Sequence, residues 1–153
     1  MKIYIAGKIT GLPETEALER FLGAENLLMH CGHTPLNPMK MVKETLINRD
    51  ADIFGPYCRG DHKYLLGRYQ RKPHKHAACL RCGRPSEWPY GEELSAAIRI
   101  LLTQAEGVYF LDNYRDSRGA MIERYIAQTL EMPMFFKTED IPLGCDWPEP
   151  KER

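Results

Sequence analysis

Residues 112–123 carry the side chains of this chain that are best suited to chemistry. They read Asp-Asn-Tyr-Arg-Asp-Ser-Arg-Gly-Ala-Met-Ile-Glu and come directly after an apolar, strand-like run. A helix beginning near Ser117 and Gly119 would offer unpaired backbone N–H groups and a positive dipole end to a phosphate or a sugar hydroxyl. Glu123 would lie one turn further along, where a carboxylate beside a bound ribose is a candidate nucleophile or general base. The alternative is an ordinary capped helix with one solvated acid.

The elements that would position this stretch alternate between strands and helices. Short apolar runs predict buried strands, and apolar residues at helical spacing predict the helices between them. The expected strands span 2–6, 33–38, 107–111 and 133–136, and the expected helices span 13–32, 90–104 and 118–130. This order predicts an α/β fold with a small parallel, flavodoxin- or Rossmann-like sheet flanked by helices. Ligands of such sheets bind beyond the carboxyl ends of the strands, where the loops 7–11 and 112–119 fall.

Length and composition favour one domain with no membrane segment. At 153 residues, 43% of them hydrophobic, the chain buries one sizeable core, so we expect a single domain over 1–153 with a loose tail at 138–153. The formal net charge is zero, so no overall field attracts nucleic acid or an anionic membrane. No apolar run has the length of a secretory signal or of a bilayer span, and the prediction is a cytoplasmic protein.

Residues 39–89 differ from the rest and are predicted to form a basic, Cys/His-rich insertion in the domain. Between 58 and 84 there are eight lysines and arginines against one acid, a local charge of +7. Cations interleaved with tyrosine and histidine suit single-stranded nucleic acid. A local positive charge equally attracts a phosphorylated small ligand, and charge runs are usually solvated faces, so nucleic acid is not the favoured partner.

The spacing of two cysteines in this insertion indicates a structural zinc site. Cys79-Leu-Arg-Cys82 has the form of a zinc knuckle, which supplies half of a tetrahedral site. The predicted ligand set is Cys58, His62, Cys79 and Cys82. His74 and His76 are alternative donors, and a pair of free thiols in a basic loop is the alternative to a metal. An odd number of cysteines, five, does not suit a disulfide framework.

The loop Gly7-Lys8-Ile9-Thr10-Gly11 follows the first expected strand. It matches neither the P-loop pattern nor G-x-G-x-x-G, which disfavours a typical nucleotide hydrolase. Its glycines suit either a close backbone approach to phosphate or ribose, or a tight turn from strand to helix. Lys8, between the two glycines, is a candidate partner for an anion.

Two motifs together resemble the nucleoside 2-deoxyribosyltransferase-like superfamily. The first is Tyr4-Ile-Ala-Gly-Lys-Ile-Thr-Gly11, and the second is Ser117-x-Gly119-x-x-x-Glu123 after the penultimate strand. The superfamily includes 2'-deoxynucleoside 5'-monophosphate N-glycosidases and many small phage and prophage domains of unassigned function, and the chain looks closest to the phage and prophage group. The resemblance covers residues 1–38 and 90–137.

The resemblance implies a role for each matching position. Residues of the first loop would line the pocket, with Tyr4 or a nearby residue under the ribose, and Ser117 and Gly119 match positions that hold the 5'-phosphate. The substrate-binding set is Tyr4, Gly7, Lys8, Ile9, Gly11, Ser117, Arg118 and Gly119. Glu123 matches the carboxylate that attacks C1' as the base departs, and water or another base then resolves the glycosyl-enzyme.

One departure from the family concerns the acid that assists the leaving base. Family members usually have an aspartate on the helix before the penultimate strand, and here the corresponding positions, 97–98, are Ala and Ile. The glutamates at 92–93 lie about one and a half turns upstream. Asp112 or Asp116 could supply the acid from the loop instead. Loss of such an acid costs on the order of 10²–10⁴ in rate.

Three functions from different classes follow from these features. The first is an enzyme that cleaves or exchanges the N-glycosidic bond of a (deoxy)nucleoside monophosphate, with Glu123 as nucleophile and Asp112 or Asp116 assisting. The second is a non-catalytic protein that binds a nucleotide or nucleotide signal, and the third is a zinc-dependent nucleic-acid adaptor. Because relatives commonly complete each pocket with a neighbouring subunit, the resemblance also implies a homo-oligomer.

Overall fold

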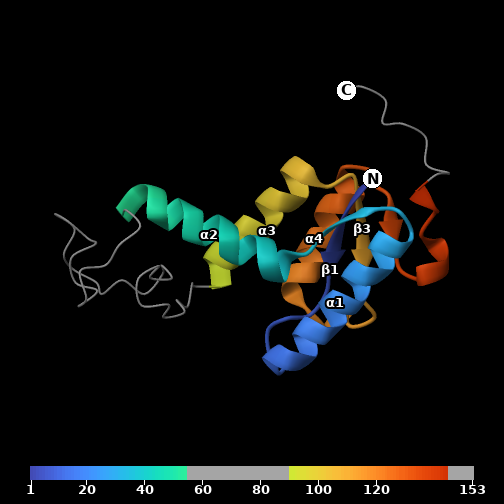
Figure 1. Cartoon of the computed structure of the whole chain (residues 1–153), viewed down its shortest axis with the longest axis horizontal. Helices are drawn as coiled ribbons and strands as arrows, with labels where there is room; N and C mark the ends of the chain where they lie inside the picture. The colour runs from blue at the N-terminus through green and yellow to red at the C-terminus, as the bar shows by residue number, and fades with distance from the viewer. Residues whose placement is uncertain (55–89, 145–153) are drawn as a thin grey trace. The chain divides into compact units, whose positions relative to one another are not determined.

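A computed structural model describes residues 1–54 and 90–144 of the chain (Figure 1). The chain divides into two compact units, one of residues 1–39 with 98–153 and one of residues 40–97. Within the described ranges every helix is too short or too polar to span a bilayer. The elements in chain order are β1 Lys2–Ala6, α1 Glu14–His30, β2 Thr34–Leu36, α2 Pro38–Phe54, α3 Tyr90–Gln104, β3 Gly107–Phe110, η1 Tyr114–Asp116, α4 Arg118–Thr129, β4 Met134–Phe135 and η2 Thr138–Asp140.

The sheet is entirely parallel and confirms the predicted α/β fold. Its strand order is β2-β1-β3-β4. In the centre, Tyr4 pairs with Val108 and Ala6 with Phe110, so β1 and β3 end side by side. Pro35, which has no N–H to donate, lies in the edge strand β2 opposite Ile3, where the missing donor is tolerated. The predicted bounds of β1 are reproduced, and β3 and β4 begin or end within one residue of prediction.

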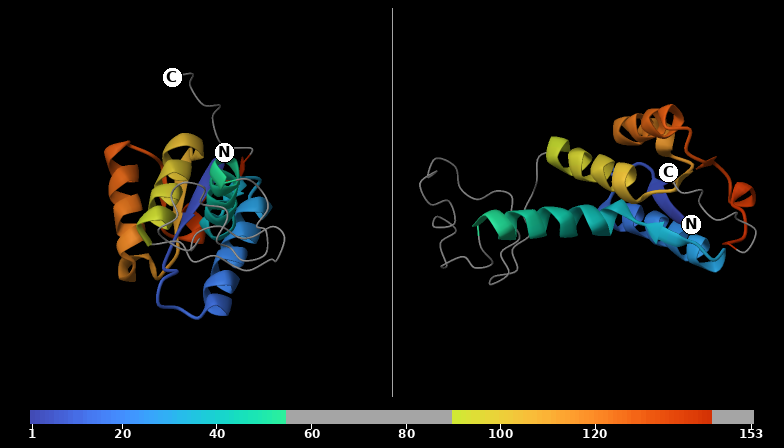
Figure 2. Two further views of the ribbon diagram at one scale, coloured as in Figure 1. Left: turned by 90° about the vertical axis from the view of Figure 1, so that its left-hand side faces the viewer. Right: turned by 90° about the horizontal axis from the view of Figure 1, so that it is seen from above.

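The helices α1 and α4 cover opposite faces of the sheet (Figure 2). The connection β1-α1-β2 moves toward one edge of the sheet, whereas β3-α4-β4 moves toward the other. Because crossovers between parallel strands are right-handed, opposite directions put the two helices on opposite faces. The strand order therefore reverses between β1 and β3, and a crevice for ligands is expected beyond their carboxyl ends.

Alternation along β1 assigns each of its side chains to one of these faces. Ile3 and Ile5 pack in the core cluster with Phe21 and Leu28 of α1. Since successive side chains of a strand point to opposite faces, Tyr4 points toward the face that α4 covers. Tyr4 has no exposed surface, and α4 contacts β1 directly.

Residues 138–144, the first part of the expected loose tail, pack against the rest of the chain. Ile141 is buried within the same core cluster as Ile3 and Phe21. His33 Nε2 lies 2.6 Å from the carbonyl oxygen of Pro142, and the N–H of Gly144 donates to the carbonyl of Cys31 over 2.7 Å. A buried apolar anchor and two polar contacts attach this segment to the end of α1 and the start of β2. Residues 145–153 of the predicted tail lie outside the described residues.

The helix α2 lies where the sequence showed little sustained periodicity. Its start has a strong local cause, because Asn37 Oδ1 accepts from the N–H of Met39 over 3.0 Å and Pro38 is the first helical residue. Pro38, Val42 and Leu46, spaced four residues apart, are its buried positions among those whose burial is described. The first part of the predicted insertion 39–89 is therefore helical, and its residues 55–89 lie outside the described part of the chain.

Candidate functional site

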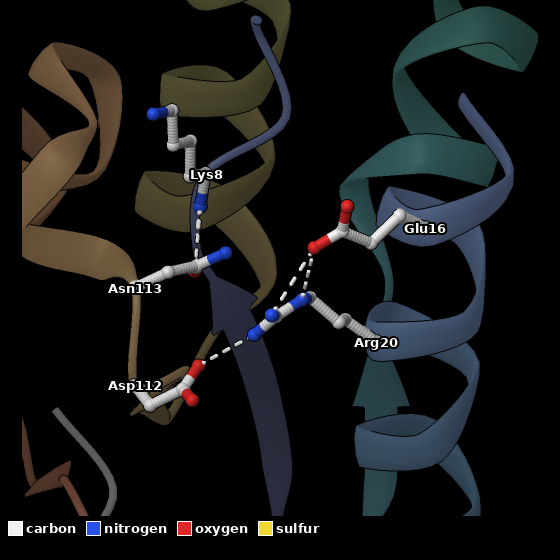
Figure 3. A network of polar contacts seen from close by, with 5 residues as sticks. All are labelled: Lys8, Glu16, Arg20, Asp112 and Asn113. Carbon is white, nitrogen blue, oxygen red and sulfur yellow. Dashed lines mark hydrogen bonds and ion pairs between the residues drawn. The ribbon is translucent and has the colours of Figure 1, made fainter. Parts of the chain in front are cut away.

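The two loops singled out from the sequence meet at the carboxyl ends of β1 and β3 (Figure 3). The N–H of Leu111 donates to the carbonyl of Ala6 over 2.9 Å, which extends the strand pairing by one residue. One step further, the N–H of Lys8 donates to Asn113 Oδ1 over 3.1 Å. The loop 7–11 and the loop 112–117 are thus joined at the point where the strand order reverses.

Gly7 occupies the tightest point of this junction. A Cβ built on Gly7 would lie 2.7 Å from Leu111 Cδ1 and 3.1 Å from Leu111 Cβ and Cγ. Only a residue without a side chain allows the chain after β1 to pack this closely against the chain after β3. The need for glycine here comes from packing between the loops.

Replacing Gly7 with alanine should therefore destabilise the protein. We expect the free energy of unfolding to fall by about 1–3 kcal/mol, because the added methyl overlaps the Leu111 side chain. Chemical denaturation measures the change.

The control is Gly23→Ala on the exposed surface of α1, where an added Cβ meets nothing within 4 Å. That change should stabilise the protein by about 0.5–1 kcal/mol, because alanine favours the helix. Equal effects of the two changes would contradict the packing argument.

The rest of the first loop is an exposed turn. The N–H of Leu12 donates to the carbonyl of Ile9 over 3.2 Å, and Gly11, the third residue of this turn, has φ +83°. A positive φ at that position is typical of a type II turn and favours glycine. Ile9 and Gly11 are both exposed.

Tyr4 and Glu123 form a buried pair across the face of the sheet that α4 covers. The Tyr4 hydroxyl donates to Glu123 Oε1 over 2.7 Å, and Glu123 is only 6% exposed. The buried residues of α4 recur at helical spacing: Gly119, Ala120, Glu123 and Ala127. Glu123 is the one carboxylate on this otherwise apolar face, and Tyr4 is its hydrogen-bond partner among the described residues.

Burial controls the ionisation of this pair. Desolvation raises the pKa of Glu123 from 4.5 to about 7, although the hydrogen bond from Tyr4 opposes that rise. The pKa of Tyr4 lies well above its usual value, first because of burial and then because a negative Glu123 is adjacent. Near neutral pH, Glu123 is therefore divided between its acid and carboxylate forms while Tyr4 stays neutral. A carboxyl group with this balance suits proton transfer or nucleophilic attack.

The Tyr4→Phe variant tests this coupling. Removing the hydroxyl removes the bond that favours the Glu123 carboxylate, so the pKa of Glu123 should rise further above 7. The loss should also cost about 1–3 kcal/mol of stability at alkaline pH, where the carboxylate is charged. A carboxyl-carbon NMR titration of Glu123 in both proteins measures the shift. An unchanged or lowered pKa in Tyr4→Phe would contradict the assignment of this bond.

The second motif contributes the start of α4. Ser117 is the N-cap, and its Oγ accepts from the N–H of Ala120 over 3.2 Å. Capping engages one of the four N–H groups that a helix start leaves open, and the N–H groups of Arg118 and Gly119 precede the first intrahelical bond. Arg118 is exposed, whereas Gly119 is buried on the inner surface of α4. The helix is capped, but its acid, Glu123, is buried and not solvated, and the cap leaves backbone donors beside the junction of the loops.

The predicted assisting acids are both exposed. Asp112 Oδ1 pairs with Arg20 Nη1 of α1 over 2.9 Å, and Glu16 also binds Arg20 over 3.2 Å (Figure 3). Asp116 lies in η1 and makes a backbone contact to Asn113 over 3.1 Å. An exposed pair such as Asp112–Arg20 contributes little stability, roughly 0–1 kcal/mol. The effect of this ion pair is to connect the loop after β3 to α1. Arg20 and Asn113 were not identified as site residues from the sequence.

An aromatic cluster supports η1 on the side toward β4. The rings of Phe110 and Phe136 stack at 5.1 Å, and Tyr114 lies 5.1 Å from Phe110 and 5.6 Å from Phe136. The guanidinium groups of Arg115 and Arg124 lie 5.7 and 5.8 Å from the centre of the Tyr114 ring. Cations over ring faces stabilise such clusters. The cluster fixes the loop that carries Asn113 and precedes Ser117.

The predicted zinc ligands Cys58, His62, Cys79 and Cys82 lie outside the described residues. Within residues 1–54 and 90–144 there is no group of three or more His, Cys, Asp or Glu side chains that could hold a metal ion. Zinc in the 39–89 segment stays a prediction, which elemental analysis of the protein and of Cys79→Ser would test.

Comparison with known proteins places the chain in a family. A family model described as "Domain of unknown function (DUF4406)" matches residues 1–53 and 67–136. No curated protein and no solved structure matches the chain. The matched ranges include both loops, Tyr4 and Glu123, and also residues 39–53 and 67–89 of the predicted insertion.

Proposed function

The chain belongs to this family of unknown function, DUF4406, and because the family's description assigns no activity, we propose one from the site: hydrolysis or exchange of the N-glycosidic bond of a (deoxy)nucleoside monophosphate. Glu123 is the nucleophile. The observation that carries the proposal is the buried Tyr4–Glu123 pair, in which one carboxylate oxygen is held at 2.7 Å and the pKa lies near neutrality.

The reaction has two steps, as in retaining glycoside chemistry. In the first, an oxygen of the Glu123 carboxylate bonds to C1', the C1'–N bond breaks, and the base leaves with the bonding electrons and takes up a proton. In the second, water or another base bonds to C1', the ester bond to Glu123 breaks, Glu123 leaves as a carboxylate, and the incoming group gives up a proton. Tyr4 holds the carboxylate in place and stabilises it as it regains its charge.

The junction of the loops supplies the binding groups in this proposal. Lys8 and the open N–H groups at the start of α4 lie on the two loops that meet beyond β1 and β3, and both are suited to a 5'-phosphate. Asp112 or Asp116 assists departure of the base. Asp112 is engaged by Arg20, so its use requires that ion pair to open.

A nucleotide-binding protein without catalysis is the second candidate. The observation that favours it is the pair of apolar residues, Ala97 and Ile98, where the resembling family usually carries an aspartate. Such a protein would use the same loops and would retain Tyr4 and Glu123 for binding. The proposal in either form includes a homo-oligomer in the cytoplasm, and sedimentation of the purified protein tests its oligomeric state.

The test is incubation of the protein with a panel of nucleosides and (deoxy)nucleoside monophosphates, followed by chromatography for free base. Release of base supports the enzyme. A rise in the melting temperature with nucleotide, without release, supports the binder. Neither release nor stabilisation by any member of the panel would refute both.

A further inference from the structure

Asn113 is the first side chain beyond β3 whose polar groups face the other loop. It caps the 3-10 helix η1, and its carbonyl accepts from the N–H of Asp116 over 3.1 Å. Its side-chain Oδ1 accepts from the N–H of Lys8 over 3.1 Å. This contact fixes the orientation of the amide, because a flipped amide would set one donor against another.

The orientation leaves the nitrogen of the same amide without a partner. Asn113 Nδ2 is buried, and no acceptor lies within hydrogen-bonding distance of it in the described part of the chain. It carries two N–H donors. Buried donors without acceptors are rare, because burial removes their hydrogen bonds to water and no new hydrogen bond replaces them. An acceptor from outside the described chain is therefore expected at this point.

The neighbouring acids do not meet this need. Glu16 Oε1 and Asp112 Oδ1 both bind Arg20, and neither acid is a hydrogen-bond partner of Asn113 Nδ2. Figure 3 shows Asn113 Nδ2 on the side of the amide that faces α1, with the Lys8 side chain pointing away from it. The donor thus lies at the reversal of the strand order, where ligands of parallel sheets bind.

We propose that Asn113 Nδ2 donates a hydrogen bond to an oxygen of the bound ligand and so positions it between the two loops. The inference rests on the proposed function, in which that ligand is a nucleotide. The acceptor is a phosphate oxygen, a sugar hydroxyl or a carbonyl of the base. All three present an oxygen that can accept a hydrogen bond from a neutral amide. Asn113 is a binding residue and takes no part in bond breaking.

The Asn113→Asp variant tests this. It keeps an oxygen for the N–H of Lys8 and replaces the donor nitrogen with an acceptor of the same size. The affinity is measured by calorimetry for a deoxynucleoside monophosphate, the corresponding deoxynucleoside and deoxyribose 5-phosphate. Loss of the bond should weaken binding about tenfold or more. Weakening limited to the two phosphorylated probes identifies phosphate as the acceptor, weakening limited to the two that carry the base identifies the base, and weakening of all three identifies the sugar.

The matched control is Asn26→Asp, which makes the same exchange at an exposed position of α1 and leaves Asn113 intact. Its affinities should stay within about twofold of the unmodified protein. Equal weakening in both variants, or affinities unchanged in Asn113→Asp, would overturn the inference while the proposed function stands. If the unmodified protein binds none of the probes, both are overturned.

A measurement on the unmodified protein avoids any dependence on the folding of the variant. The two Nδ2 protons of Asn113 give a pair of side-chain amide signals in a ¹⁵N-correlated NMR spectrum. On addition of the deoxynucleoside monophosphate, at least one of them should move downfield as it gains an acceptor. Saturation of binding with both signals unmoved would overturn the inference.

Discussion

Replacing Glu123 with glutamine should lower the rate of base release by about 10³-fold or more, as expected for a residue that acts directly in the bond-breaking step. An amide nitrogen or oxygen in place of the carboxylate cannot form the glycosyl ester at C1'. The change is nearly isosteric, and glutamine still offers an oxygen to the Tyr4 hydroxyl, so the fold and nucleotide binding should persist. Single-turnover release of base and calorimetric affinity separate the two effects.

Two further variants make this result specific to the position. Glu123→Asp keeps a carboxylate but withdraws it by one methylene, so it should retain part of the activity. Glu19→Gln, which removes an exposed carboxylate from α1, should have the rate of the unmodified protein. A Glu123→Gln protein that releases base within about tenfold of the normal rate would exclude nucleophilic catalysis by this residue. Loss of affinity together with rate would favour the binding function.

The parts of the fold that sequence reasoning predicted are those with a local cause. The strands β1 and β3 are short and continuously apolar, and α1 and α3 carry apolar residues at helical spacing, so each element is specified by its own residues. For α2 the local signal was present but was assigned to the wrong element. Asn37-Pro38 is a typical helix start, with a capping side chain and a proline in the first turn, and it was interpreted as the end of a strand.

Predicting the site required contacts between segments far apart in the sequence. Glu123 was found from its place one turn past Gly119 at an expected helix start and from its match to the second motif. Its partner could have been predicted from the alternation of strand side chains, because Ile3 and Ile5 assign Tyr4 to the opposite face of β1. Arg20 and Asn113 depend on how two loops and a helix meet, which no local pattern specifies. The packing of Ile141, likewise, follows from contacts with a core cluster that includes residues of β1 and α1, more than a hundred positions earlier.

The buried carboxyl that serves the proposed reaction should also make the protein less stable as the pH rises. The pKa of Glu123 is about 7 in the folded protein against 4.5 for the unperturbed group, so folding favours the protonated form. Its stabilising effect is complete below pH 4.5 and is lost as the pH rises through 7, where the folded protein must hold a buried charge. The difference of about 2.5 units corresponds to roughly 3 kcal/mol.

The Glu123→Gln protein should therefore gain stability over the unmodified protein as the pH rises from 5 to 8. Glutamine does not titrate, so the gain should reach about 2–3 kcal/mol between these limits, which corresponds to several degrees of melting temperature for a domain of this size. Thermal unfolding of both proteins in buffers of constant ionic strength measures it, with Glu19→Gln as the variant whose difference from the unmodified protein should not change with pH. A difference that is constant from pH 5 to pH 8 would mean that Glu123 titrates near its ordinary value. The residue would then be a fully ionised carboxylate at neutral pH. The inference that burial beside Tyr4 divides Glu123 between its acid and carboxylate forms would be wrong.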